Sequence, residues 1–200
     1  MLIFKKTIIV VLAFLCNGMA VSLFIQAGFG LDSISVLSAG LANVFHTSVG
    51  IASLGFYFII ILGAFFVDRS YISGATLLSL IIVGPSIDQF ARLVSLVVTP
   101  ESDMIIRVIF YIIAFLCLAF AIALYLAANF GISGADLITI MVSEKAGLQF
   151  RWCKIVFDIS VITIGILLGG VFGAGTIIQG LLTGPTVQYF RGNLEKRLKL

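Results

Sequence analysis

Long apolar stretches with few charges constrain the fold of this chain more than any other feature. Of its 200 residues, 61% are hydrophobic and only 10% are charged. A water-soluble domain usually carries charge on about a quarter of its residues. This chain cannot cover its surface in that way, so we expect its surface to face lipid. In lipid only helices and closed barrels satisfy their backbone hydrogen bonds, and the continuous apolar runs indicate helices.

Six stretches are long and apolar enough to span a bilayer, which takes about 20 residues each. They are residues 7–27, 49–67, 75–98, 105–128, 155–171 and 176–190. Lys5 and Lys6 before the first stretch are typical of a signal peptide, but the apolar run continues long enough to span. We therefore expect an uncleaved first span, and the six spans leave no room for a separate soluble domain.

Two apolar segments are too short and too polar to cross. Residues 32–46 follow the first span, and residues 135–146 occupy the same place in the second half. Both are predicted to be short interfacial or re-entrant helices. Asp32 and Asp136 lie near their starts, where a carboxylate can cap free backbone amides or point toward a central cavity.

The chain contains an internal repeat. At an offset of 101 residues, positions 6–30 give 10 identities in 25, and Ala13-Phe14-Leu15-Cys16 recurs unchanged as residues 114–117. At an offset of 100, Gly84-Pro85 recurs as Gly184-Pro185. Asp32 is matched with Asp136 after a small insertion. Shared hydrophobicity alone does not produce ordered matches of Cys, Gly-Pro and Asp.

Each repeat has an odd number of predicted spans, so the second copy must enter the membrane from the opposite side. With the amino terminus in the cytoplasm, 10 of the 12 basic residues fall on the cytoplasmic side, as the positive-inside rule requires. Only Arg92 and Arg107 lie outside. The sequence thus predicts an all-α polytopic membrane protein with both termini cytoplasmic. Residues 1–98 and 99–200 form two inverted three-helix repeats within one membrane domain.

Inverted repeats are common in secondary transporters, whose substrate site lies near the midplane between the two halves. Gly84-Pro85 and Gly184-Pro185 fall inside predicted spans, and interrupted helices at matching places are a pointer to such a site. The alternative is a packing kink without a ligand.

Two further carboxylates lie within predicted spans, where charge is costly. Asp88 shares a helix face with Arg92, so it belongs either to the site or to an ion pair at the outer interface. Its repeat mate is Gln188, which argues against a symmetric pair of carboxylates. Asp158 is expected to be neutralised by Lys154, and its predicted repeat mate is Phe58.

The predicted substrate path combines these repeat-matched and polar positions. It comprises Asn17, Asp32, Thr76, Gly84, Pro85, Asp88, Asp136, Thr176, Gln179, Gly184 and Pro185. His46 is the only histidine, and the three cysteines lack the spacing of a metal or disulfide framework. No phosphate loop or catalytic pair can be assembled. We therefore expect no cofactor, no metal, no nucleic-acid partner and no enzymatic activity.

The chain resembles the YczE/YyaS/YitT-like bacterial integral membrane proteins. Gly28-Phe29-Gly30-Leu31-Asp32, Gly74-Ala75-Thr76 and the Gly-Ala-Gly-Thr stretch at 173–176 carry the resemblance. It departs at Ser33, where a proline would follow in a Gly-x-Gly-x-x-Pro pattern. The resemblance implies a plasma-membrane protein of poorly defined biochemical role, and some members are similar to factors that affect secondary-metabolite production.

Two functions are compatible with these features. The first is a transporter-like protein that moves a small molecule or ion through a site between the repeats. The second is a non-transporting membrane factor that regulates or stabilises a membrane protein partner, for example in secondary-metabolite production. A transporter should contain a polar cavity between the halves, whereas such a factor can be packed solid there.

Overall fold

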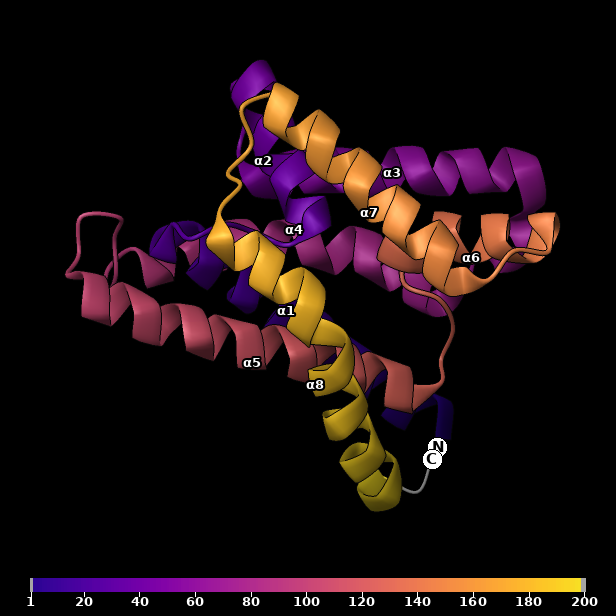
Figure 1. Ribbon diagram of the computed structural model, residues 1–200. Coiled ribbons are helices and arrows are strands. Elements are labelled where there is room, and N and C mark those ends of the chain that lie inside the picture. The colour runs from indigo at the N-terminus through magenta and orange to yellow at the C-terminus, as the bar shows by residue number, and fades with distance from the viewer. Residues whose placement is uncertain (1, 199–200) are drawn as a thin grey trace.

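The computed structural model describes residues 2–198, which form eight α-helices and one short 3-10 helix (Figure 1). The elements are α1 (Leu2–Ala27), α2 (Ser33–Phe45), α3 (Val49–Asp68), η1 (Arg69–Tyr71), α4 (Gly74–Val94), α5 (Met104–Ala128), α6 (Gly134–Ala146), α7 (Phe150–Leu167) and α8 (Ala174–Leu198). The all-α prediction is confirmed for this part of the chain, and both short segments are helical as expected.

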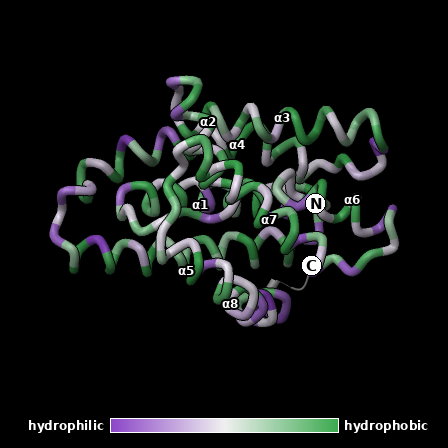
Figure 2. Tube along the Cα trace, turned by 45° about the horizontal axis from the view of Figure 1, so that its top comes forward, coloured by the Kyte–Doolittle hydropathy of each residue, from purple (hydrophilic) through white to green (hydrophobic). Residues whose placement is uncertain are grey.

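Four of these helices are long and apolar enough to cross a membrane: α1, α3 extended to Tyr71, α4 and α5. Their outer faces carry large exposed apolar side chains, such as Phe66 at 78% and Ile81 at 65% exposure. Figure 2 shows hydrophilic residues mainly at the links and in the last part of α8. Such a surface suits lipid rather than water. α7 contains three charged residues and α8 contains four, so a total of six spans stays a prediction.

Several predicted boundaries differ from the structure. α1 begins at Leu2, five residues before the predicted first span, and α8 ends at Leu198, eight residues after the predicted last span. α4 ends at Val94, four residues before the predicted end of the third span.

α7 begins at Phe150 and ends at Leu167, so it is displaced toward the amino terminus from the predicted 155–171. Gly169, with φ 82°, terminates it, because a left-handed residue cannot continue a helix. Apolar composition indicates which residues can lie in lipid. It does not indicate the residue at which the helical hydrogen bonds end.

The matched helices α1 and α5 form a central antiparallel pair. Lys6 near the start of α1 donates a hydrogen bond to the Asn129 carbonyl at the end of α5, at 3.3 Å. Arg107 near the start of α5 donates to the Ala27 carbonyl at the end of α1, at 2.8 Å. Between these ends, the Cys16 thiol lies 3.6 Å from the carbonyl of its own repeat mate. These reciprocal contacts place equivalent ends of the two helices at opposite ends of the pair.

The helices α4 and α8 begin against links of the opposite half. The Thr76 hydroxyl in the first turn of α4 donates to the Ile132 carbonyl in the α5–α6 link, at 2.6 Å. The Gly175 amide in the first turn of α8 donates to the Phe29 carbonyl in the α1–α2 link, at 2.8 Å. Each half therefore completes hydrogen bonds of the other.

Glycines allow this close docking. Gly30 and Gly131 have φ 117° and 124°, where side chains are rarely tolerated. A Cβ atom on Gly30 would lie 2.5 Å from the Thr176 hydroxyl, and one on Gly131 would lie 2.3 Å from the Ser73 hydroxyl. The matching Phe-Gly pairs of the repeat thus have a structural cause.

The helix boundaries also correct one pairing of the repeat. α3 and α7 begin at Val49 and Phe150, an offset of 101 residues. This offset matches Asp158 with Tyr57, and the predicted match with Phe58 is wrong by one residue. Tyr57 is buried, at 4% exposure. Polar groups therefore occupy this position in both halves.

Candidate functional site

The amino-terminal ends of the two short helices meet at the middle of α7. Ser33, the first residue of α2, donates a hydrogen bond to Asp158 Oδ1 at 2.8 Å. Asp136, in the first turn of α6, lies 3.8 Å from Lys154 Nζ. Lys154 and Asp158 are the fifth and ninth of the 18 residues of α7. The carboxylates thus lie at helix ends whose free amides favour negative charge.

Lys154 bridges two carboxylates. Its ammonium lies 2.9 Å from Asp158 Oδ1 and 3.8 Å from Asp136 Oδ1, and its side chain is 29% exposed. Tyr125 of α5 donates a short hydrogen bond, 2.5 Å, to the other Asp136 oxygen. The predicted neutralisation of Asp158 by Lys154 is confirmed. The same lysine also lies close to Asp136.

Asp32 adds a third carboxylate beside this group. It caps α2 by accepting the Ser35 amide at 3.4 Å, as expected for a capping residue. Its other oxygen, Oδ1, is buried and has no hydrogen-bond partner among the described residues. Burial raises the pKa of the Asp32 carboxyl, and the Ser35 hydrogen bonds and then the positive charge of Lys154 oppose that rise.

The two matched aspartates do not have equivalent structural roles. Ser133, at an offset of 101 residues from Asp32, caps α6 by accepting the Ala135 amide. Asp136 lies in the first turn, and its carboxylate is directed to Lys154 and Tyr125 instead. The capping prediction is therefore right for Asp32 and wrong for Asp136. A serine at the cap position leaves the later carboxylate free to bind other groups.

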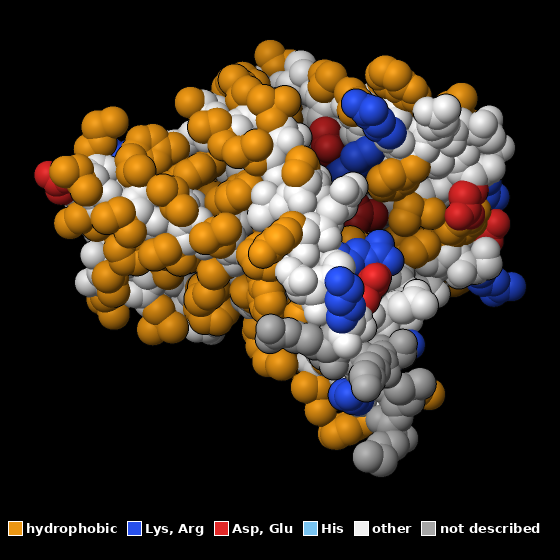
Figure 3. Space-filling view, turned by 60° about the horizontal axis from the view of Figure 1, so that its bottom comes forward, with side chains coloured by type: hydrophobic (Ala, Val, Ile, Leu, Met, Phe, Trp, Pro, Cys, Tyr) orange, Lys and Arg blue, Asp and Glu red, His pale blue; other side chains and the backbone are white. Residues whose placement is uncertain are grey.

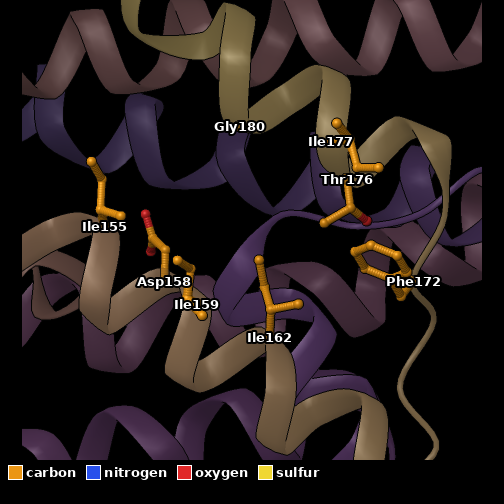
Figure 4. A pocket seen from close by; sticks show the side chains of 8 residues that line it. All are labelled: Ile155, Asp158, Ile159, Ile162, Phe172, Thr176, Ile177 and Gly180. Atoms are coloured by element: carbon orange, nitrogen blue, oxygen red, sulfur yellow. The ribbon is translucent and has the colours of Figure 1, made fainter.

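A cavity of about 240 Å³ lies between α7 and α8 (Figure 4). Figure 4 shows the Asp158 carboxylate pointing into the space between the two helices. Apolar side chains make most of the wall. They are Ile155, Ile159 and Ile162 of α7, Phe172 of the following link and Ile177 of α8. Thr176 and Gly180 of α8 complete the lining.

The cavity exists because α7 and α8 do not pack as their repeat mates do. In the first half, α3 and α4 touch through glycines, and a Cβ atom on Gly84 would lie 2.5 Å from the Gly50 carbonyl oxygen. At the matching positions the second half has Arg151 and Gly184. A Cβ atom on Gly184 would meet no other part of the described chain within 4 Å. Among the described residues α7 and α8 hardly touch, since arginine replaces the glycine that close approach requires.

The space-filling view shows this region from outside. In Figure 3, acidic side chains are set back in a recess between helices, and Lys and Arg side chains lie beside them. The left part of that face is mostly apolar, and further charged side chains lie at its left and right edges and in its lower part. Within this view the recess is where acidic side chains are set back behind basic ones.

Asp88 lies away from this recess and has a capping role. It accepts a hydrogen bond from the Ser48 hydroxyl at 2.5 Å and one from the Gly50 amide at 2.9 Å, at the start of α3. The predicted ion pair with Arg92 is wrong within residues 2–198, where Asp88 forms no salt bridge. Free amides at a helix start compete well for a carboxylate that reaches them.

The Gly-Pro pairs do not interrupt their helices. α4 and α8 both continue through proline, and both Pro85 and Pro185 are exposed. A proline removes one backbone hydrogen bond, which a packed helix can tolerate. Gly84 contacts α3, whereas Gly184 faces open space. Neither pair lies among the residues that line the cavity between α7 and α8.

The other predicted path residues have different surroundings. Gln179 is buried under α5 and donates to the Tyr111 hydroxyl at 2.6 Å, with its own carbonyl oxygen unpaired. Thr176 lines the cavity, whereas Thr76 binds the opposite link. Asn17 is half-buried in α1. The structure thus brings together only part of the predicted path, chiefly Asp32 and Asp136.

Sequence reasoning missed Tyr125, Ser33 and the bridging role of Lys154. Ser33 stands where the family pattern has proline, and that departure was a signal because serine can donate to Asp158. Tyr125 carried no signal, since an aromatic residue in a span is ordinarily a packing residue.

Comparison with known proteins identifies the family without an activity. The model of the family of unknown function DUF6198 matches residues 4–192. An uncharacterized protein of Haemophilus influenzae is 27% identical over 190 residues, which cover 94% of this chain and 84% of that protein. The uncharacterized membrane protein YczE of Bacillus subtilis is 23% identical over 136 residues, 65% of this chain and 61% of YczE.

No solved structure matches this chain. The match to YczE confirms the resemblance to YczE-like membrane proteins, and the apolar helices agree with a membrane protein. Since the family model covers nearly the whole sequence, the chain is a member of the DUF6198 family of unknown function.

Proposed function

We propose that this membrane protein is a transporter built from two inverted three-helix repeats, and that it moves a small solute through the recess beside α7. The antiparallel α1–α5 pair and the reciprocal docking of α4 and α8 support inversion. The 18 residues of α7 correspond to about 27 Å, close to the thickness of a bilayer core. Its charges face protein groups, as intramembrane charges usually do.

The unequal packing of matched helix pairs is the observation that carries this proposal. α3 and α4 are in close contact through Gly50 and Gly84, whereas an open cavity lies between α7 and α8. In transporters with inverted repeats, the two halves adopt different conformations and exchange them to open the site to either side. With the predicted topology, residues 168–173, which join the two helices, lie on the outer side, and the start of α7 lies on the cytoplasmic side.

The short helices support a site near the midplane. α2 runs beside α7 from Asp158 to the α7 carboxyl end, where Asn43 donates to the Gly169 carbonyl at 3.3 Å. We propose that α2 and α6 are re-entrant half-helices, whose amino-terminal ends commonly form ion and substrate sites. The distribution of basic residues supports cytoplasmic termini. The resemblance to YczE-like proteins supports a location in the plasma membrane.

Distance measurements between spin labels test the proposal. The labels are attached at Ile155→Cys and Gly180→Cys, on opposite walls of the cavity, in a chain whose native cysteines are replaced by alanine. A transporter should show two distance populations, open and closed. Gly84→Ala places a methyl group against the Gly50 carbonyl oxygen, so it should separate α3 from α4. If the two halves exchange conformations, a larger fraction of molecules should then show the short distance between the labels on α7 and α8. Gly184→Ala is the matched control and should change nothing.

A second candidate function rests on the same space between α7 and α8. A transmembrane helix of a partner protein could occupy the gap between α7 and α8, and this chain would then act as a membrane factor without transport. The gap should in that case stay open in the purified protein. One unchanged distance in all three proteins would contradict the transporter proposal and favour this alternative.

A further inference from the structure

The cavity between α7 and α8 combines one carboxylate with hydrocarbon walls. Asp158 is the charged residue that lines it, and Thr176 supplies a hydroxyl. Most of the remaining lining consists of isoleucine and phenylalanine side chains. Small-molecule sites are typically apolar with a few polar groups that fix orientation. The composition therefore selects a ligand with a single charged group and an apolar body.

Asp158 retains capacity to bind such a charged group. Both of its recorded hydrogen bonds, from Ser33 and from Lys154, go to Oδ1. Oδ2 accepts none from the described residues, although a carboxylate can accept several. Figure 4 shows the carboxylate facing the cavity rather than the helix packing. A donor in the cavity can therefore bind Asp158 without first removing Ser33.

The charges around the cavity leave a deficit of positive charge. Asp32, Asp136 and Asp158 share Lys154 as their one close cation among the described residues. The nearby Arg191 is bound to Glu195 at 2.6 Å, and that pair is neutral. Arg151 lies seven residues before Asp158, about 10 Å along the helix, which is near the screening length at 0.1 M salt. An added monocation would therefore be stabilised.

Divalent metal ions fit this cavity poorly. Calcium takes six to eight oxygen ligands, and magnesium requires octahedral oxygen coordination. The cavity offers one carboxylate and one hydroxyl. An alkylammonium ion needs only a few acceptors for its N–H groups, and its hydrocarbon part replaces water along the isoleucine wall.

We propose that the cavity binds a small primary ammonium compound with an aliphatic body, and that Asp158 Oδ2 accepts its N–H group. This substrate class rests on the proposed transport function, but binding can be tested without it. The ammonium could also belong to an aminophospholipid. Asp158 lies about 12 Å along α7 from Phe150, whereas the headgroup layer is about 5–7 Å thick, so the depth favours a soluble amine.

Calorimetric titration of the full chain in phosphatidylcholine nanodiscs tests the inference. The probes share one skeleton: isopentylammonium, neutral isopentanol and anionic isovalerate. Isopentylammonium should bind, and the other two should bind at least about 10-fold more weakly, since a hydrogen bond to a charged group is worth about 1.5–3 kcal/mol. Asp158→Asn should weaken amine binding at least about 10-fold. Glu101→Gln, in an exposed link, should leave it unchanged.

A second pair of variants keeps the test valid if Asp158→Asn fails to fold. Gly180→Leu fills the cavity and should abolish binding, because Gly180 lines it and has open space around it. Gly184→Leu, four residues on and outside the lining, should bind normally. Equal binding of all three probes, binding only to isovalerate, or loss of binding only when phosphatidylethanolamine is added would overturn the inference.

Flux measurements with the same probes separate this inference from the transport proposal. Isopentylammonium that binds but never crosses proteoliposomes would leave the site standing and contradict transport. Isovalerate flux without any amine binding would support transport and overturn the proposed substrate class.

Discussion

At the scale of single residues, Lys154 is the cation that stabilises the carboxylates of the recess. It lies close to two carboxylates and is only 29% exposed, and Asp32 adds negative charge nearby. A carboxylate that loses its partner in such a place keeps the cost of its desolvation. This side chain therefore matters more for stability than a typical surface lysine does.

Lys154→Met should destabilise the protein. The aliphatic replacement keeps the packing but leaves Asp158 and Asp136 without a cation. Partial exposure reduces the loss to about 1–3 kcal/mol, or roughly 3–10 °C in melting temperature. Fluorescence of Trp152, the single tryptophan, measures the transition in detergent.

Two further variants check the cause of that loss. Lys145→Met removes the exposed pair with Asp68, so it should cost at most about 1 kcal/mol. Adding Asp158→Asn to Lys154→Met should recover part of the stability. Equal effects of Lys145→Met and Lys154→Met would show that the recess is not electrostatically coupled.

At the scale of elements, the first turns of α4 and α8 are equivalent in sequence but not in energetics. Thr76 is fully buried, donates to Ile132 at 2.6 Å and accepts the Ser73 amide at 3.0 Å. Among the described residues, the Thr176 hydroxyl forms one hydrogen bond, which it accepts from the Gly173 amide at 3.4 Å. The docking of α4 is thus fully hydrogen-bonded, and that of α8 is looser.

Thr76→Val should therefore cost more than Thr176→Val. The first change removes the acceptor of the half-buried Ser73 amide and leaves the Ile132 carbonyl with only the weaker Ser73 hydroxyl bond at 3.2 Å, at a cost of about 1–3 kcal/mol or roughly 3–10 °C in melting temperature. The second should lower the melting temperature by less than half as much. Thermal unfolding of both variants measures the difference, and equal shifts would mean that α4 does not depend on the opposite link.

The sequence predicted every helix but not the interactions between them. Apolar length located the long helices, and the repeat matched α1 with α5 because Ala13-Phe14-Leu15-Cys16 and Phe29-Gly30 recur in order. It could not show that Asp88 caps α3, since that depends on how α3 approaches α4. Nor could it show that Asp32 and Asp136 meet at α7, because no local pattern specifies a contact between residues 104 positions apart.

At the scale of the whole molecule, positions 46 and 145 lie at opposite ends of α3. His46 precedes the helix by three residues, and Lys145 pairs with Asp68, its last residue, at 3.1 Å. The 20 residues of α3 extend about 30 Å, which is the thickness of a bilayer core. If α3 spans the membrane, the two positions face different compartments.

Cysteine labelling tests this orientation. In a chain without native cysteines, His46→Cys should react with a membrane-impermeant maleimide added to intact cells, and Lys145→Cys should react only after lysis. The reason is that basic residues gather on the side of Lys145. The reverse pattern would invert the orientation, and reaction of both positions in intact cells would contradict a spanning α3.

The crosswise contacts of α4 and α8 bear on how the molecule is assembled. Residues 1–98 alone would leave the Thr76 hydroxyl without the Ile132 carbonyl, and residues 99–200 alone would leave the Gly175 amide without Phe29. During synthesis, therefore, the first half of the chain is in the membrane before the second half can supply the partners of these hydrogen bonds. A single unit of this kind could satisfy the same bonds only by pairing with a second copy inserted upside down.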